Sequence, residues 1–150
     1  MIRHAQSADV AEIMQLINTA AHNGKVLSVS EDFVLEHILN YLVYEDNGIY
    51  GCVCLRVYTQ TLGEIRSLVV QPEYRNKGIA QQLIHHALSI GEKIGLEKIF
   101  ALTYLEDYFN NLGFETINKD SLPEKIWQDC VKCPKFAHCD ETAVQYIITK

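Results

Sequence analysis

The stretch from Glu64 to Leu88 constrains the fold most, because its hydrophobic period changes there within a few residues. It reads "EIRSLVV", then "QPEYRNKGIA", then "QQLIHHAL". The first part is typical of an apolar strand. The last belongs to an amphipathic helix whose apolar residues stand three or four apart, at Ile79, Leu83, Ile84, Ala87 and Leu88. We therefore expect a strand, a loop rich in Arg, Lys and Gly, and a helix in direct succession.

Two helices and a hairpin precede this unit. Ser7 is the expected N-cap of a helix that ends at Gly24, and Ser30 opens a second helix. The inward positions of the second helix are Val34, Leu35 and Ile38. The period then becomes two, and "YLVYE" leads into "DNG", a strong hairpin signal, and a return strand at 49–59. One face of that strand carries Ile49, Gly51, Val53, Leu55 and Val57, and the other carries Tyr50, Cys52, Cys54, Arg56 and Tyr58.

Alternating elements follow the central helix. We expect a strand at 98–103, a short helix from Glu106 to Leu112 with Gly113 as its C-cap, and a strand at 114–118. A further helix is predicted to open at "SLPE" (121–124), before a final strand at 142–149. This order predicts one mixed, mostly antiparallel sheet with helices on both faces, an α/β (α+β) class. The length suits a single domain over residues 1–150.

Composition narrows the classes of partner. The net charge of −6 argues against a nucleic-acid partner, because such binding needs a basic face. No apolar run approaches the roughly 18 residues of a membrane helix, and the first residues do not read as a signal peptide. The odd count of 5 cysteines favours free thiols in a reducing compartment. We expect a cytoplasmic protein without a membrane partner, and the oligomeric state stays open, a homodimer included.

The loop 71–80 is the strongest candidate for chemistry. It lies between a strand and a helix, so its N–H groups stand at a helix N-terminus, where they have no intrahelical partner and the helix dipole is positive. A pyrophosphate suits such a place. Gly78 allows close backbone approach, and Arg75 and Lys77 add charge. The spacing alone is also that of a solvated turn at the start of a helix.

Longer stretches resemble a known family. The segment "SLVVQPEYRNKGIAQQLIHHAL" resembles the acetyl-CoA-binding motif of the GNAT N-acetyltransferase superfamily, and "YFNNLGF" (108–114) is similar to its later signature. The order of the predicted elements is also similar. Within the superfamily, "LGEIRSLVVQPEYRNKGIA", "KIFALTYLEDYFNNLGFETINKDSLPEK" and "WQDCVKCPKFAHCDE" resemble short, stand-alone N-acetylglutamate synthases. The resemblance implies transfer of an acetyl group from acetyl-CoA to a primary amine, here the α-amine of an amino acid in arginine biosynthesis.

The resemblance also implies where the cofactor binds. The strand 64–70 would diverge from the strand 98–103, and its backbone would hold the pantetheine and the thioester at Leu68, Val69 and Val70. An N–H near Val69 or Val70 would bind the thioester oxygen. The pyrophosphate would rest on Arg75, Asn76, Lys77, Gly78, Ile79 and Ala80.

Two residues are candidates for proton transfer. The attacking amine must first lose a proton, and Glu64 is the candidate general base, directly or through water. The alternative for Glu64 is a solvated carboxylate at a strand end. The superfamily often supplies the thiolate's proton from a Tyr at the position of Phe109, and here the hydroxyl has moved to Tyr108. Tyr104 and water are the other candidates for this acid.

The acceptor site is expected on the face of Glu64. Arg66 lies two residues from Glu64 and therefore shares its face of the strand, where a guanidinium would clamp a carboxylate. A plain surface ion pair is the alternative. The glutamate-acetylating relatives carry an Arg where this chain has Ser28, and Lys25 would have to compensate. Other acceptors therefore stay in view, namely a polyamine, an aminoglycoside or a protein N-terminus, as does a non-catalytic acetyl-CoA-binding module.

The tail "DCVKCPKFAHCDE" raises a separate question. Cys130 and Cys133 form a Cys-x-x-Cys pair, and Cys139 follows His138. Zinc needs four ligands, and adjacent residues seldom both point at one ion, so the second half of a zinc site is poor. Zinc, a redox pair and simple packing are the three interpretations. We predict packing and no metal.

Overall fold

The computed structural model describes residues 1–123 and 141–148. Its helical elements are η1 (Ser7–Asp9), α1 (Val10–His22), α2 (Glu31–Glu36), η2 (Ile38–Asn40), η3 (Pro72–Tyr74), α3 (Ile79–Lys93), α4 (Glu106–Asn111) and η4 (Lys119–Ser121). Its strands are β1 (Ile2–His4), β2 (Tyr41–Glu45), β3 (Ile49–Val57), β4 (Leu62–Val70), β5 (Lys98–Thr103), β6 (Glu115–Ile117) and β7 (Thr142–Ile147). Ser121 ends η4, and the helix predicted beyond it lies outside the described residues.

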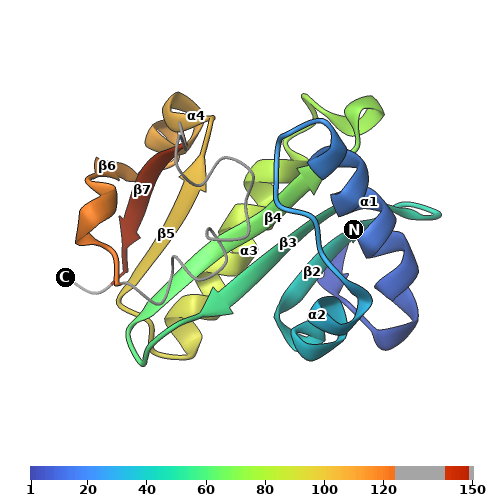
Figure 1. Cartoon of the computed structure of the whole chain (residues 1–150), viewed down its shortest axis with the longest axis horizontal. Helices are drawn as coiled ribbons and strands as arrows, with labels where there is room; N and C mark the ends of the chain where they lie inside the picture. The colour runs from blue at the N-terminus through green and yellow to red at the C-terminus, as the bar shows by residue number, and fades with distance from the viewer. Residues whose placement is uncertain (124–140, 149–150) are drawn as a thin grey trace.

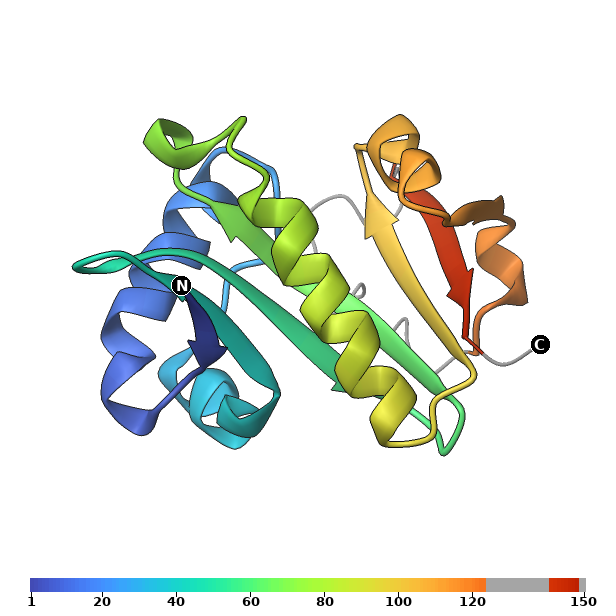
Figure 2. The same ribbon diagram turned by 180° about the vertical axis from the view of Figure 1, so that it is seen from behind.

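One sheet organises the described part of the chain. Its 7 strands lie in the order β1-β2-β3-β4-β5-β7-β6. Every neighbouring pair is antiparallel except β4 and β5, which run parallel and are joined by α3. Helices α1 and α2 cover one face of the sheet, and α3 crosses the other (Figures 1 and 2). The predicted mixed, mostly antiparallel sheet with helices on both faces is confirmed.

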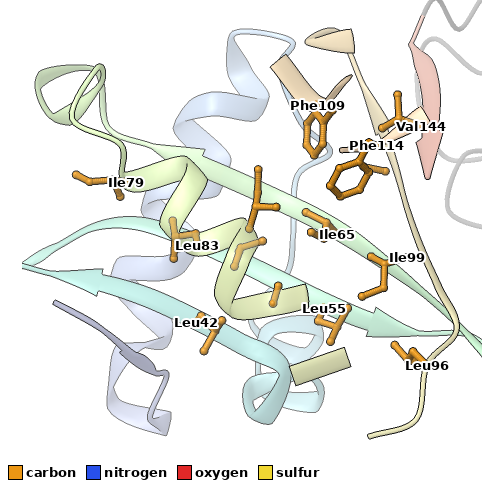
Figure 3. Packing of buried hydrophobic residues seen from close by; sticks show 14 residues of the cluster. Leu42, Leu55, Ile65, Ile79, Leu83, Leu96, Ile99, Phe109, Phe114 and Val144 are labelled. Atoms are coloured by element: carbon orange, nitrogen blue, oxygen red, sulfur yellow. The ribbon is translucent and has the colours of Figure 1, made fainter. Parts of the chain in front are cut away.

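The face under α3 holds the larger core. Ile79, Leu83 and Ile84 of α3 are buried against apolar residues of β2 to β5, and Phe109 and Phe114 extend this cluster toward β7 (Figure 3). Gly91 lets the helix lie close on the sheet, because a Cβ there would stand 2.5 Å from Ile99 Cδ1. Burying each large side chain stabilises the fold by roughly 1.5–3 kcal/mol, so this face holds α3 firmly in place.

The opposite face is built from α1 and α2. Ile13 and Ile17 of α1 and Val34 of α2 are fully buried against Val43 and Cys52 of the sheet. The predicted position of Leu35 is wrong, since its side chain is 40% exposed. Helix α2 lasts only from Glu31 to Glu36, and Val34 occupies the inward direction of that short turn.

Two further predictions need correction, and one strand was missed. The start of α1 is not capped by Ser7: the 3₁₀ turn η1 comes first, and the Asp9 carboxylate accepts from the Gln6 N–H at 2.7 Å. The edge strand β1 was not predicted, because three residues carry too little periodic signal. Ile49 packs with the α1 side and not with Val53, because an irregularity in the β2–β3 pairing leaves Tyr50 as an extra residue.

Candidate active site

Helix α3 begins without a cap. Gly78 precedes it in the left-handed conformation at φ 78°, no side chain among residues 1–123 and 141–148 caps it, and its first turn holds no acidic residue. A Cβ on Gly78 would meet only Gln82 Nε2, at 4.0 Å, so packing within the described residues does not exclude a side chain here. Glycine suits this position because it adopts a positive φ readily and leaves the space beside the helix start unfilled. The helix start is therefore available to an anion.

The loop before α3 brings positive charge to this helix start. Arg75 Nε donates to the Val70 carbonyl at 3.3 Å, which ties the loop to the end of β4. Lys77 Nζ lies 5.1 Å from the centre of the Tyr74 ring, and Tyr74 stacks on Tyr50 at 4.2 Å. Both cations are exposed. The loop thus forms a fixed, positive rim around the free N–H groups.

Strands β4 and β5 pair only near their beginnings. Their parallel ladder joins Leu62 to Lys98, Gly63 to Ile99 and Glu64 to Phe100. Beyond Glu64 the two strands diverge, as Figure 2 shows, and α3 begins beside the end of β4. The predicted divergence is confirmed. Backbone groups on this edge of β4 have no β5 partner in the described ladder, so an extended ligand has somewhere to hydrogen-bond.

A bulge interrupts β4 at the point of divergence. Cys52 pairs with Val69 and Cys54 pairs with Arg66, so Ser67 and Leu68 together face the single residue Val53. Ser67 adopts φ 54°, which is strained for a residue with a side chain. The extra residue shifts the alternation, so that Leu68 and Val70 pack with the α3 side and Val69 packs with the α1 side.

Glu64 is the last residue of β4 that pairs with β5, and it is only 8% exposed. The Tyr58 hydroxyl donates to Glu64 Oε1 at 2.8 Å. Burial, together with the negative charge of Glu64, raises the pKa of Tyr58, so this hydroxyl keeps its proton and remains a donor. The carboxylate is thus held in place and is not the solvated strand-end group of the alternative interpretation.

Two arginines lie on the face of Glu64. The guanidinium carbon of Arg66 is 5.0 Å from the centre of the Phe33 ring, and that of Arg56 is 5.7 Å from the same ring. Arg56 also lies 4.9 Å from the Tyr58 ring. Phe33 of α2 therefore places both cations, and the shared face predicted for Glu64 and Arg66 is observed. Arg56 was not singled out by the sequence, although it pairs directly with Glu64 across β3 and β4.

Ser28 lies apart from this group. It is exposed in the segment between α1 and α2, where the Asn18 side chain holds Val29 through hydrogen bonds of 3.1 and 2.9 Å. Lys25 is exposed in the same segment. Among residues 1–123 and 141–148, the structure records no hydrogen bond or ion pair that joins either side chain to Glu64 or Arg66.

Helix α4 separates its two aromatic residues. Phe109 is 3% exposed and meets Phe114 edge to face at 5.0 Å, so it is a core residue. Tyr108 is half-buried against the α3-side cluster, and burial raises its pKa. Tyr104 is 42% exposed just beyond β5. The hydroxyls of Tyr108 and Tyr104 both remain candidates for the acid, and Phe109 serves packing.

A family model described as "Acetyltransferase (GNAT) family" matches residues 8–114, which hold the loop, the bulge and Glu64. The chain belongs to the GNAT acetyltransferase family. The resemblance seen in the sequence is confirmed, and this GNAT protein is an acyltransferase with acetyl-CoA as its co-substrate.

Named relatives agree with this assignment. An uncharacterised N-acetyltransferase of Chlorobaculum tepidum is 38% identical over 144 residues, 95% of this chain and 93% of the relative. An amino-acid acetyltransferase of Mycobacterium tuberculosis is 29% identical over 134 residues, 86% of this chain and 76% of the relative.

A solved structure of N-acetylglutamate synthase from Neisseria gonorrhoeae, complexed with coenzyme A and N-acetyl-glutamate, superposes with a TM-score of 0.88 at 27% identity. That comparison covers 100% of this GNAT chain and 35% of the synthase, so the chain spans about a third of the longer enzyme.

Other features of this GNAT chain lie away from the site. A hollow of about 160 Å³ opens between β2, β3 and the end of α3, and its lining includes Leu42, Leu55 and Ile94. No helix in the described ranges is long and apolar enough to cross a bilayer. In the same part of the chain, no three metal-binding side chains gather. Cys130, Cys133, His138 and Cys139 lie outside the described residues, so their interpretation stays a prediction.

Proposed function

We propose that this GNAT acetyltransferase moves the acetyl group of acetyl-CoA to the α-amine of an amino acid, with glutamate as the expected acceptor. The observation that carries the proposal is the group formed by Glu64, Arg66 and Arg56, which places a buried carboxylate beside two guanidinium groups. A carboxylate suits an ammonium that must lose its proton, and guanidinium groups suit carboxylates. An acidic amino acid carries both kinds of partner, one ammonium and two carboxylates.

The cofactor would follow the edge of β4. Its pyrophosphate would lie on the uncapped start of α3, within the positive rim of Arg75, Asn76 and Lys77, with the backbone of Gly78, Ile79 and Ala80 donating. Its pantetheine would run along the edge that β5 leaves unpaired, against Leu68, Val69 and Val70. This course would bring the thioester to the bulge at Ser67 and Leu68, on the strand that also carries Glu64.

Transfer would proceed by direct attack. Glu64 takes a proton from the acceptor's ammonium, directly or through water, and the free amine attacks the thioester carbonyl carbon. Negative charge develops on the thioester oxygen, and a backbone N–H at the bulge stabilises it. The carbon–sulfur bond then breaks, and the thiolate of CoA takes a proton from Tyr108, Tyr104 or water. As the intermediate collapses, its nitrogen gives its second proton to water, which leaves the neutral amide.

The two arginines would select an acceptor by its negative charge. Arg66 would hold one carboxylate of the substrate. Arg56 would supply the second positive charge, in place of the arginine that the glutamate-acetylating relatives carry at the position of Ser28. An acceptor with two carboxylates matches two cations and one base. Such an enzyme would supply N-acetylglutamate for arginine biosynthesis, and the free thiols of Cys52 and Cys54 agree with work in the cytoplasm.

One observation favours a second acceptor class. Ser28 is small, neutral and exposed, so the segment between α1 and α2 offers no arginine to a substrate carboxylate. A primary amine with only one anionic group, or with none, would then be the substrate of the same acetyl transfer.

A thiol-release assay tests the proposal. Acetyl-CoA is offered with each standard amino acid and with several polyamines, and glutamate should give the highest kcat/KM. Glu64→Gln should lower kcat by about 10²–10⁴-fold, the usual contribution of a general base, with the Kd for CoA unchanged. Tyr58→Phe removes only the donor to Glu64 and should have a smaller effect.

The acceptor clamp has its own test. Arg66→Ala and Arg56→Ala should each raise KM for glutamate about tenfold or more and leave KM for a neutral amino acid unchanged. Lys93→Ala, at the far end of α3, makes the same charge change away from the site and should leave both values alone. Turnover of a polyamine but not of glutamate would refute the amino-acid assignment.

A further inference from the structure

The β4 bulge is held from the neighbouring strand by a buried thiol. Cys52 of β3 is fully buried, and its Sγ donates to the Ser67 carbonyl at 3.4 Å. Burial raises the pKa of Cys52, so its sulfur keeps the proton that it donates. The contact reaches the strained residue of the bulge, since Ser67 is the one with φ 54°. A side chain is therefore attached to the backbone at the point where β4 changes its alternation.

This contact also fixes the next N–H group. The Ser67 carbonyl and the Leu68 N–H belong to one peptide unit, and every peptide bond in the described chain is trans. In a trans peptide the C=O and N–H bonds point in opposite directions. Because the carbonyl points toward Cys52 on β3, the Leu68 N–H points away from β3. The next strand on that side is β5, which has already diverged from β4.

We propose that Cys52 is a positioning residue for acetyl transfer: it holds the Ser67 carbonyl and thereby aims the Leu68 N–H at the thioester oxygen. This inference rests on the proposed course of acetyl-CoA along β4. Cys52 touches neither substrate nor cofactor, and it acts through the peptide unit between Ser67 and Leu68. Because the αL conformation is unfavourable for an L-residue, that unit would relax toward the ordinary strand conformation without a partner.

Neighbouring Cys54 provides a matched control. It lies two residues along β3, is equally buried and packs in the same α1-side cluster. It pairs with Arg66, before the bulge, and no hydrogen bond from its thiol to Ser67 or Leu68 is recorded in the described residues. Replacing either cysteine by alanine removes one buried sulfur from the same core, so a difference between the two variants reports the hydrogen bond.

The experiment compares Cys52→Ala, Cys52→Ser and Cys54→Ala in the full chain. Acetyl-CoA labelled with carbon-13 at the thioester carbonyl is bound to each protein, and the carbonyl stretch is read by difference infrared spectroscopy. We expect a lowered carbonyl frequency in the wild type, Cys54→Ala and Cys52→Ser, and its loss in Cys52→Ala. A full oxyanion donor contributes about 10²–10³ to kcat, so losing its orientation should lower kcat about tenfold, with the Kd for CoA within about twofold.

Three results would overturn the proposal in distinguishable ways. A lowered frequency that persists in Cys52→Ala would show that the thiol does not aim the donor. Equal kcat losses in Cys52→Ala and Cys54→Ala, without recovery in Cys52→Ser, would show a packing effect. No frequency change in the wild type would remove the thioester from the bulge altogether, and with it the proposed course of the cofactor. Cys52→Ser keeps the test informative should Cys52→Ala fail to fold.

Discussion

Helices α2 and α3 begin in opposite ways. At the start of α2, Ser30 Oγ accepts from the Phe33 N–H at 3.1 Å, and Glu31 and Asp32 supply negative charge in the first turn. Within the part of the chain that the structure describes, the start of α3 has no capping side chain. Its first turn holds no acidic residue, and a glycine at φ 78° precedes it. A capped start uses its N–H groups for folding, whereas an uncapped start keeps them for a ligand. The contrast supports the proposal that the pyrophosphate of the cofactor binds at the start of α3.

The largest expected effect is a loss of CoA affinity when a negative charge is placed at the start of α3. Gly78→Asp should lower the affinity for CoA about a hundredfold, because its carboxylate would occupy the helix start and repel the pyrophosphate. Asn is its neutral control, since it has the same shape and similar tolerance of positive φ. Calorimetric titration with CoA measures both variants. If the pyrophosphate binds at the start of α3, the Asp variant should bind CoA at least about tenfold more weakly than the Asn variant. Equal affinities would contradict this site.

Asp9 stabilises the 3₁₀ turn η1 just before α1, and it does not cap the first N–H groups of α1. Its carboxylate accepts from Arg3 at 2.8 and 3.1 Å and from the Gln6 N–H at 2.7 Å. Asp9→Asn should lower the free energy of unfolding by about 2 kcal/mol at neutral pH, the range for hydrogen bonds to charged groups. The affinity for CoA should not change. Urea unfolding measures the loss, and Asp120→Asn on the exposed surface is the control.

The same pair predicts a dependence on pH. The Arg3 guanidinium, with help from the Gln6 N–H, lowers the pKa of Asp9 below its ordinary value of 3.8. The stability from this group is therefore complete above the unfolded-state pKa and is lost as the pH falls through the lower folded-state pKa. The wild type and Asp9→Asn should converge in acid. A constant difference between them at all pH values would rule out this linkage.

The smallest expected effect concerns the capped start of α2. Ser30→Ala removes the cap of α2 and should cost about 1 kcal/mol of unfolding free energy. The affinity for CoA should stay within error of the wild type, because this helix start is closed to ligands. Ser89→Ala, an exposed change within α3, serves as the control for both measurements. A weaker affinity for CoA in Ser30→Ala alone would mean that α2 takes part in cofactor binding.

Strong periodic segments predicted most of the fold. The change of period at the loop placed β4, α3 and the cofactor loop, because burial of Ile79 and Leu83 demands a helical repeat. Weak or tertiary features escaped prediction. The cap at Ser7 was wrong because the Arg3 side chain draws Asp9 into a turn before α1. The outward position of Leu35 depends on where α2 ends, which local sequence does not specify.

The candidate site was predicted where residues lie on one strand. Glu64 and Arg66 share a face by alternation alone, and both precede the bulge. Arg56 and Cys52 were missed because their neighbours depend on the register between β3 and β4. That register shifts by one residue at Ser67 and Leu68, and a shift of one exchanges the neighbours across the strands. A Ser within an apolar strand was the only local sign of the bulge.

The most direct test of the open helix start is a map of amide signals on binding. Protein labelled with nitrogen-15 is titrated with CoA, and backbone amide shifts are compared at the two helix starts. We expect the largest shifts at Gly78, Ile79 and Ala80, a second group at Leu68 to Val70, and no change at Phe33 or Val34. Shifts centred on α2, or an unchanged start of α3 when CoA is saturating, would contradict cofactor binding at the start of α3.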